Sequence, residues 1–120
     1  MEEILPVRNQ ILPIKKIYND IVININDTLH ILSFGQFRFT KIQPYWRHLK
    51  NISMVYVLIY QDEFIYIGQT SDFAARMLCH SYDKKFDEII TIECDSRKSA
   101  YRIESRLIKR YQPKLNIKSR

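Results

Sequence analysis

The apolar residues between positions 21 and 42 fall into three short runs, a pattern typical of strands. Alternation of apolar and polar residues is clearest at Ile21, Ile23 and Ile25. In chain order, the runs and the turn signals between them are residues 21–25, Asn26-Asp27, residues 29–34, Gly35-Gln36 and residues 37–42. This spacing predicts a β-meander. Pro44 and the aromatic residues after it break the pattern, so we expect the meander to end there.

The second half of the chain carries stronger signals. Two runs rich in β-branched and aromatic residues, joined by a loop at residues 61–63, predict an antiparallel hairpin. Residues 70–72 and 95–96 offer N-cap side chains for two helices, and Pro113 stops the second helix. The predicted elements are strands at 54–60 and 64–68, a helix at 73–81, a strand at 89–94 and a helix at 97–111.

This ββαβα order predicts an α/β protein of the α+β kind, in which a small antiparallel three-stranded sheet is flanked by helices. The β-meander would extend this unit at its N-terminal side. We expect two segments: residues 1–52 form an N-terminal β arm, and residues 53–120 form the main domain. By hypothesis, the arm serves substrate recognition or dimerisation.

Composition narrows the class of protein. The 120 residues suffice for one compact domain with an arm, and 46% hydrophobic with 27% charged residues is typical of a globular chain. Cys79 and Cys94 are the only cysteines, which excludes a disulfide framework, and no run of about 18 apolar residues predicts a membrane span. We therefore expect a cytoplasmic protein. Lys and Arg number 19 against 13 Asp and Glu, a net charge of +6, which favours a polyanionic partner such as nucleic acid or an acidic membrane face.

One carboxylate stands out in the last predicted helix. At about 100° per residue, Glu104 falls within the apolar arc that contains Ile103 and Leu107. A buried charge is costly unless it is paired or binds a metal. Glu104 is therefore either a buried residue satisfied by an arginine or backbone donor, or a metal ligand or acid–base group at a cleft.

The opposite face of the same helix is basic. Its residues are Lys98, Arg102, Arg106 and Lys109. Such a face is commonly solvated. Equally, it could bind nucleic-acid phosphates away from the site of chemistry.

Two pairs of side chains earlier in the domain are further candidates for chemistry. If the hairpin loop has three residues, Tyr56 and Tyr66 are diagonal neighbours on one face, whereas a two-residue turn would separate them. Arg76 and His80 lie four apart on a helix and can face a common anion. Gly68, at a strand end, permits close approach of the backbone. The alternatives are a packed pair of core tyrosines, an ordinary surface pair and a tight turn.

In chain order, these residues resemble the signature of the GIY-YIG nuclease superfamily. The residues that carry the resemblance are Tyr56, Tyr66-Ile67-Gly68, Arg76, His80, Glu104 and, after Pro113, Asn116. Their spacing is close to that of the family, and the resemblance covers roughly residues 53–118. One departure is plain: the first tripeptide is Met54-Val55-Tyr56, so its glycine is missing while its tyrosine is kept. We recognise no counterpart of residues 1–52 in that family.

The resemblance implies a role for each matched side chain. Glu104 would hold one divalent cation, Mg²⁺ or Mn²⁺, with water and phosphate oxygens completing the shell. Arg76 would offset charge on the phosphoryl group, and Tyr56 would act as the general base that activates water. A phenol has an ordinary pKa near ~10, so Tyr56 needs a depressed pKa or a proton relay. The cation, Tyr66 and His80 are the candidates for that relay.

The activity implied by the resemblance is that of a metal-dependent DNA endonuclease that leaves 5′-phosphate and 3′-hydroxyl ends. Gly68 and Asn116 would be structural residues at its site. Because one such site cuts one strand, a double-strand break would need a homodimer on DNA or two successive nicks. The substrate is duplex or branched DNA, with RNA as an alternative. The small size favours low sequence specificity or recognition of a short site. The biological setting that we expect is a phage or a mobile element.

Two other classes of function stay open. One is a catalytically silent nucleic-acid-binding protein that keeps the nuclease fold, although a binding module needs no buried Glu104. The other is a partner-binding domain that recruits another protein through an exposed β edge in residues 21–42.

Overall fold

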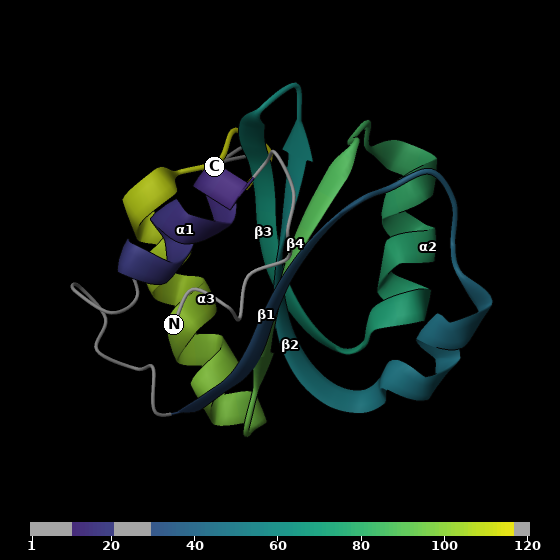
Figure 1. Ribbon diagram of the computed structural model, residues 1–120, viewed down its shortest axis with the longest axis horizontal. Helices are drawn as coiled ribbons and strands as arrows, with labels where there is room; N and C mark the ends of the chain where they lie inside the picture. Colours follow the sequence, from purple (N-terminus) through teal and green to yellow (C-terminus); the bar gives the residue numbers. More distant parts are fainter. Residues whose placement is uncertain (1–10, 21–29, 117–120) are drawn as a thin grey trace.

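The fold is an antiparallel sheet between two layers of helices (Figure 1). The structure is a computed structural model, and it describes residues 11–20 and 30–116. The helices are α1 (Ile11–Asp20), the 3₁₀ helix η4 (Pro44–Leu49), α2 (Phe73–Asp83) and α3 (Arg97–Tyr111). The strands are β1 (Ile31–Arg38), β2 (Lys50–Tyr60), β3 (Glu63–Asp72) and β4 (Glu88–Cys94), in the order β1-β4-β2-β3. The α+β class is confirmed, but within the described ranges the sheet has four strands instead of the predicted three.

The sheet separates two hydrophobic cores. Successive residues of a strand point to opposite faces, so Val55 of β2 faces α1 and α3, whereas Tyr56 faces α2 and η4. Figure 1 shows α1 and α3 on one side of the sheet and α2 on the other. Trp46 of η4 is 2% exposed and packs against Phe73 at the start of α2, with ring centroids 4.9 Å apart. This aromatic contact fastens η4 to α2.

The β2–β3 hairpin differs from its prediction at the turn and agrees with it at the tyrosines. The turn has two residues, Gln61 and Asp62, both with positive φ. The predicted three-residue loop is therefore wrong. The pairing shifts register where it passes from Ile59 to Leu58, so Leu58 pairs with Tyr66, and Tyr56 and Tyr66 are diagonal neighbours as predicted. This β-bulge restores the parity that the shorter turn alone would have changed.

β1 is one continuous strand where the sequence predicted two strands and a turn. It pairs with β4 through Gly35 and Gln36, the residues expected to form that turn. Gly35 has no positive φ, and a Cβ placed on it would lie 3.0 Å from the Thr91 hydroxyl of β4. The glycine therefore makes room for a neighbouring strand, and the predicted β-meander is wrong over these residues. The strand predicted at 21–25 lies outside the described residues.

The N-terminal segment contributes to the same core as the rest of the protein. Residues 11–20, for which no helix was predicted, form α1, with Pro13 in the first turn, where no intrahelical N–H is needed. Ile14 and Ile17 are fully buried in the core shared with α3 and β2. β2 begins at Lys50, so the boundary predicted after residue 52 falls inside that strand. The role in recognition or dimerisation stays a prediction.

The helices of the second segment follow local signals. α3 has the predicted bounds, and the Ser99 N–H donates to the Ser96 hydroxyl at 3.1 Å. α2 begins as predicted, with the Ala75 N–H donating to the Asp72 carboxylate, and runs slightly beyond its expected end to Asp83. No helix in the described ranges is long and apolar enough to cross a membrane.

Candidate functional site

Tyr56 and Tyr66 lie together on the α2 side of the sheet, on the paired strands β2 and β3. Tyr56 pairs with Gly68 and Leu58 pairs with Tyr66, so the two phenols are diagonal neighbours. Their ring centroids are 6.2 Å apart. Tyr56 is 1% exposed, whereas Tyr66 is half-buried. The pair therefore has a closed end at Tyr56 and an open end at Tyr66.

Gly68 provides the space for the Tyr56 phenol. A Cβ at position 68 would lie 2.5 Å from the Tyr56 hydroxyl oxygen and 2.7 Å from its Cζ. The Tyr66 ring closes the remaining space, with an atom 3.0 Å from the same point. The alternative of a tight turn is wrong, because Gly68 lies within β3 and has no positive φ. Glycine is required here by the volume of the phenol.

His80 of α2 contacts both tyrosines. Its Nε2 lies 2.7 Å from the Tyr56 hydroxyl oxygen, and its ring centroid is 4.9 Å from that of Tyr66. Burial, and next the nearby Lys84 ammonium, lower the pKa of His80 to about 4. The imidazole is therefore neutral at pH 7, and Nε2 can accept a hydrogen bond from the Tyr56 O–H.

The two phenols are protonated at neutral pH. Burial, and next the neighbouring Tyr66, raise the pKa of Tyr56 well above its usual range. Burial also raises the pKa of Tyr66. On both phenols the Arg76 guanidinium lowers the pKa and the Glu104 carboxylate raises it. Arg76 and Glu104 are therefore close enough to the tyrosine pair to act on its charge.

Arg76 and Glu104 influence the tyrosines electrostatically from the two helical layers. Arg76 lies exposed on α2, one turn before His80. Glu104 is half-buried on α3, which packs against β2 and β3, the latter an edge strand of the sheet. The five polar side chains of the motif thus come from β2, β3, α2 and α3 and lie around one site.

The Glu104 carboxylate fits the role of a single-carboxylate metal ligand. Among the described residues, no arginine or backbone donor binds it, and burial raises its pKa. No group of three His, Cys, Asp or Glu side chains able to hold a metal occurs in residues 11–20 or 30–116. Mg²⁺ is commonly held by one or two carboxylates together with water and substrate phosphate. Glu104 suits that kind of site and not an all-protein cage.

Asn116 extends the free edge of β3. Its Oδ1 accepts from the Ile67 N–H at 2.8 Å, and its Nδ2 donates to the Ile67 carbonyl at 2.9 Å. One residue earlier, the Leu115 N–H donates to the Ile65 carbonyl at 3.1 Å. The side-chain amide thus takes the place of a further strand and fixes β3 beside the tyrosine pair.

Met54 stands where the motif has its first glycine. It is 2% exposed and pairs with Thr70 and Glu93 of the two neighbouring strands. Its side chain belongs to the same buried cluster as Trp46 and Phe73. The hydrophobic core between the sheet, η4 and α2 therefore accommodates the side chain that replaces the missing glycine.

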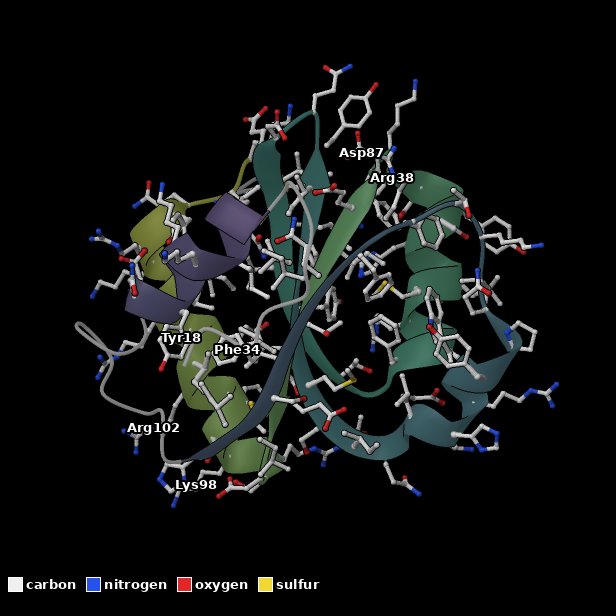
Figure 2. The ribbon with its side chains drawn as sticks, viewed as in Figure 1. Tyr18, Phe34, Arg38, Asp87, Lys98 and Arg102 are labelled. Atoms are coloured by element: carbon white, nitrogen blue, oxygen red, sulfur yellow. The ribbon has the colours of Figure 1, made fainter. Side chains whose placement is uncertain are left out.

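The basic residues of α3 lie apart from the tyrosine pair. Lys98, Arg102, Arg106 and Lys109 are all exposed. Figure 2 shows Lys98 and Arg102 projecting outward from the N-terminal half of α3. α3 packs on the face of the sheet opposite α2. Their role in DNA binding stays a prediction.

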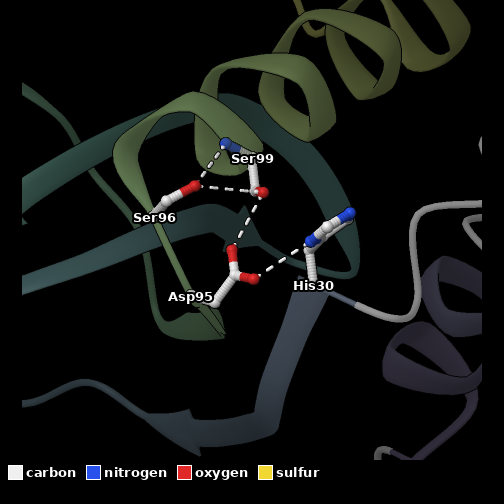
Figure 3. Close-up of polar contacts among 4 residues, drawn as sticks. All are labelled: His30, Asp95, Ser96 and Ser99. Carbon is white, nitrogen blue, oxygen red and sulfur yellow. Dashed lines mark hydrogen bonds and ion pairs between the residues drawn. The ribbon is translucent and has the colours of Figure 1, made fainter.

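A second polar cluster joins the start of β1 to the start of α3 (Figure 3). The His30 Nδ1 lies 3.0 Å from Asp95 Oδ2, and the Ser99 hydroxyl donates to Asp95 Oδ1 at 3.0 Å. Ser99 therefore contacts the carboxylate and not the imidazole, so His30 does not activate it as a nucleophile. Hydrogen bonds from His30 and Ser99 hold the pKa of Asp95 below its usual range. The cluster is a cap for α3 that also ties down β1.

Lys84 is a residue near the site that sequence reasoning missed. Its backbone N–H donates to the His80 carbonyl at 2.8 Å, and its ammonium lies 4.8 Å from the Tyr66 ring centroid. The signal that could have found it is its position four residues after His80, just past the end of the helix, where its N–H can still bond to the His80 carbonyl.

One of three comparisons with known proteins found a protein of similar fold. No protein-family model matches the chain, and no curated protein matches its sequence. Among solved structures, the chain is similar to the crystal structure of the GIY-YIG N-terminal endonuclease domain of UvrC from Thermotoga maritima bound to its catalytic divalent cation, magnesium. The identity is 25% and the TM-score 0.54, over 66% of this chain and 99% of that domain. The chain therefore has a GIY-YIG-like fold, and the likeness supports a nuclease-type function.

Proposed function

We propose that this chain, which has the GIY-YIG-like fold, is a metal-dependent DNA endonuclease. The observation that carries the proposal is the hydrogen-bonded pair of Tyr56 and His80 next to Tyr66, with Arg76 and Glu104 acting on both phenols. These groups supply proton transfer and charge stabilisation, which hydrolysis of a phosphodiester by water requires. The expected products carry 5′-phosphate and 3′-hydroxyl ends.

Tyr56 and His80 together act as the general base. Because its pKa is raised, the Tyr56 phenol can take a proton from water only if it gives up its own. The neutral His80 Nε2, 2.7 Å from the phenol oxygen, supports transfer of that proton to the imidazole. The water oxygen bonds to phosphorus as the bond from phosphorus to the 3′ oxygen breaks, and the departing 3′ oxygen takes a proton from solvent to become the 3′-hydroxyl.

Arg76, and the cation that Glu104 would hold, stabilise the negative charge at the phosphoryl group. The exposed Arg76 guanidinium contacts the phosphoryl oxygens, on which negative charge develops. Glu104 would hold the cation, Mg²⁺ or Mn²⁺, which when bound supplies charge stabilisation at the phosphoryl group and the leaving oxygen. The lack of a protein donor for Glu104 among the described residues supports this role.

DNA, duplex or branched, is the proposed substrate, and RNA is the alternative. A net charge of +6 favours binding to either polyanion. The exposed basic face of α3, made of Lys98, Arg102, Arg106 and Lys109, would add phosphate contacts away from the scissile bond. Since one site cuts one strand, a double-strand break requires two copies of the chain or two successive nicks.

Cleavage of supercoiled plasmid tests the proposal. The wild-type protein with Mg²⁺ should nick or linearise the plasmid, and EDTA should abolish the reaction. Glu104→Ala should reduce cleavage about 100-fold or more, because the cation loses its protein ligand. Glu63→Ala is a matched control: this exposed carboxylate of β3 makes a surface ion pair with Lys114 at 3.8 Å, so its loss should leave cleavage unchanged.

A gel shift on the same DNA across a salt series separates binding from cleavage. Binding without cleavage of duplex, branched or single-stranded DNA, or of RNA, would contradict the enzyme and favour a catalytically silent binding protein. A protein that neither binds nor cuts nucleic acid would point to the partner-binding function instead.

A further inference from the structure

Lys84 lies at the end of α2, beside the tyrosine pair, in surroundings unusual for a lysine. Its side chain is only 16% exposed. The backbone hydrogen bond to the His80 carbonyl places it one turn after His80. Its ammonium lies 4.8 Å from the centroid of the Tyr66 ring, within the range of a cation–π contact. Lys84 is therefore held at the open end of the tyrosine pair.

The ion pair that the Lys84 ammonium makes is a weak one. Nζ lies 3.3 Å from Asp83 Oδ1, and the Asp83 side chain is 67% exposed. Ion pairs in contact with water contribute little. An ammonium group has three donor hydrogens, of which the Asp83 carboxylate takes one. Lys84 therefore keeps donors for a ligand that enters beside Tyr66.

The Lys84 ammonium also favours the neutral form of His80. After burial, its ammonium is the largest cause of the lowered pKa of His80, and Arg76 acts in the same direction. α2 and the residue that follows it thus present two cations to a site whose phenols and imidazole are neutral. A phosphodiester that approaches Tyr66 is an anion and would be attracted by both.

We propose that Lys84 is a further substrate-binding residue, whose ammonium donates hydrogen bonds to a phosphate of the DNA strand next to the scissile bond. This inference rests on the proposed function, and Lys84 is not among the residues that carry the nuclease resemblance. The Tyr66 ring holds the ammonium in place before the substrate arrives. Less conformational freedom is then lost on binding than with a lysine in solvent.

Lys85, the next residue, is a matched control. Its ammonium lies 5.9 Å from the Tyr60 ring centroid, so it makes a comparable aromatic contact. Lys85 is exposed, however, and Tyr60 stands at the hairpin end of β2, away from Tyr56. A general effect of positive charge would be the same at both lysines, whereas a contact with bound substrate would be specific to Lys84.

The test compares Lys84→Ala, Lys84→Arg and Lys85→Ala with the wild type. Plasmid cleavage with Mg²⁺ gives kcat and KM, and fluorescence anisotropy of a labelled DNA duplex in EDTA gives the affinity. Lys84→Ala should lower kcat/KM about tenfold, mainly by raising KM, and should weaken duplex binding by a similar factor. Lys84→Arg should recover most of both losses. Lys85→Ala should stay within about twofold of the wild type, since it removes only a distant charge.

Equal losses in the two alanine variants, or no loss in either, would overturn the role of Lys84. If the wild type does not cleave, the proposed function fails, and duplex binding still decides about Lys84: a loss of affinity confined to Lys84→Ala supports the contact, and equal affinities overturn it. Circular dichroism checks that each variant is folded. Should Lys84→Ala unfold, Lys84→Met keeps the apolar stem over Tyr66 and takes its place in every comparison.

Discussion

Tyr56 and His80 are neutral for the same physical reason. Both side chains lie in the buried layer between the sheet and α2, and burial disfavours the charged form of any group. It therefore raises the pKa of the phenol and lowers that of the imidazole. A proton that reaches His80 creates a buried charge, so the imidazole releases it readily. The Tyr56–His80 pair is therefore suited to passing a proton on, and not to holding it.

The buried His80 makes stability depend on pH. Its pKa is about 4 in the folded protein against 6.5 for a free side chain, so between these values the unfolded chain binds a proton that the folded protein does not. The stability that the neutral His80 contributes should be fully present above pH 6.5. As the pH falls from 6.5 to 4, the free energy of unfolding should decrease by up to about 3 kcal/mol. Urea unfolding at a series of pH values measures it.

His80→Gln isolates this effect. Glutamine does not titrate, so the wild type should lose stability relative to the variant as the pH falls through the window from 6.5 to 4. A stability difference that stays constant over that window would contradict a buried, neutral imidazole.

The candidate site residues could be found from sequence, whereas two features around them could not. Tyr56, Arg76 and Glu104 could be found from residue type and order along the chain. Gly68 is needed because a side chain there would clash with the Tyr56 phenol, and not because of a turn. This reason could not be found from sequence, since the clash depends on which residue of β2 lies opposite. Lys84 was missed because a lysine near the end of a helix usually extends into solvent, whereas here the ammonium lies beside the Tyr66 ring, a contact that depends on the tertiary structure.

At the scale of elements, β3 depends on the segment that follows α3. β3 is an edge strand, and Asn116 satisfies the N–H and the carbonyl of Ile67 that point away from β2. Ile67 is fully buried, so these groups have little access to water if the amide is removed. Asn116 thus protects the edge on which Tyr66 stands.

Replacement of Asn116 should expose this dependence. Asn116→Ala leaves two buried backbone groups of Ile67 unsatisfied and should lower the free energy of unfolding by about 1–3 kcal/mol. Lys114→Ala, two residues earlier and exposed, should change it by less than about 0.5 kcal/mol. Chemical denaturation of the three proteins measures the difference, and equal midpoints would show that the amide contributes nothing.

Local signals predicted the elements of the second segment well and those of the first poorly. The bounds of α3 follow from a capping serine and a stopping proline, both of which act within a few residues. The Gly35-Gln36 pair has the composition of a turn, but its conformation is set by pairing with β4, more than fifty residues later in the chain. α1 was missed because Pro13 looks like a helix breaker, although a proline in the first turn is tolerated.

At the scale of the whole molecule, the described parts of the first segment are built into the fold. β1 forms one edge of the sheet, and α1 covers the core beside α3. Tyr111 at the end of α3 donates a hydrogen bond to Asp20 at the end of α1, and Arg110 lies 3.2 Å from the same carboxylate. We therefore expect α1 and the sheet to unfold together.

Trp46 can report on this coupling, because it is the only tryptophan and lies on the face of the sheet opposite α1. Ile17→Ala, a change in α1, should lower the free energy of unfolding seen by tryptophan fluorescence by about 2–5 kcal/mol. Lys15→Ala, on the exposed face of α1, should have an effect below about 0.5 kcal/mol. An unchanged fluorescence midpoint in Ile17→Ala would mean that α1 is an independent appendage.

The Tyr56 phenol fills the space that a side chain at position 68 would need, so substitutions at the two positions should depend on each other. As long as the phenol is kept, a side chain at position 68 is selected against; once the phenol is lost, the two closest contacts disappear and the Tyr66 ring alone restricts position 68. Position 54 has no such tie, since Met54 already fills it within the core. We therefore expect a side chain at position 68 only in relatives that have lost the tyrosine at position 56, and glycine at position 68 in relatives that keep it.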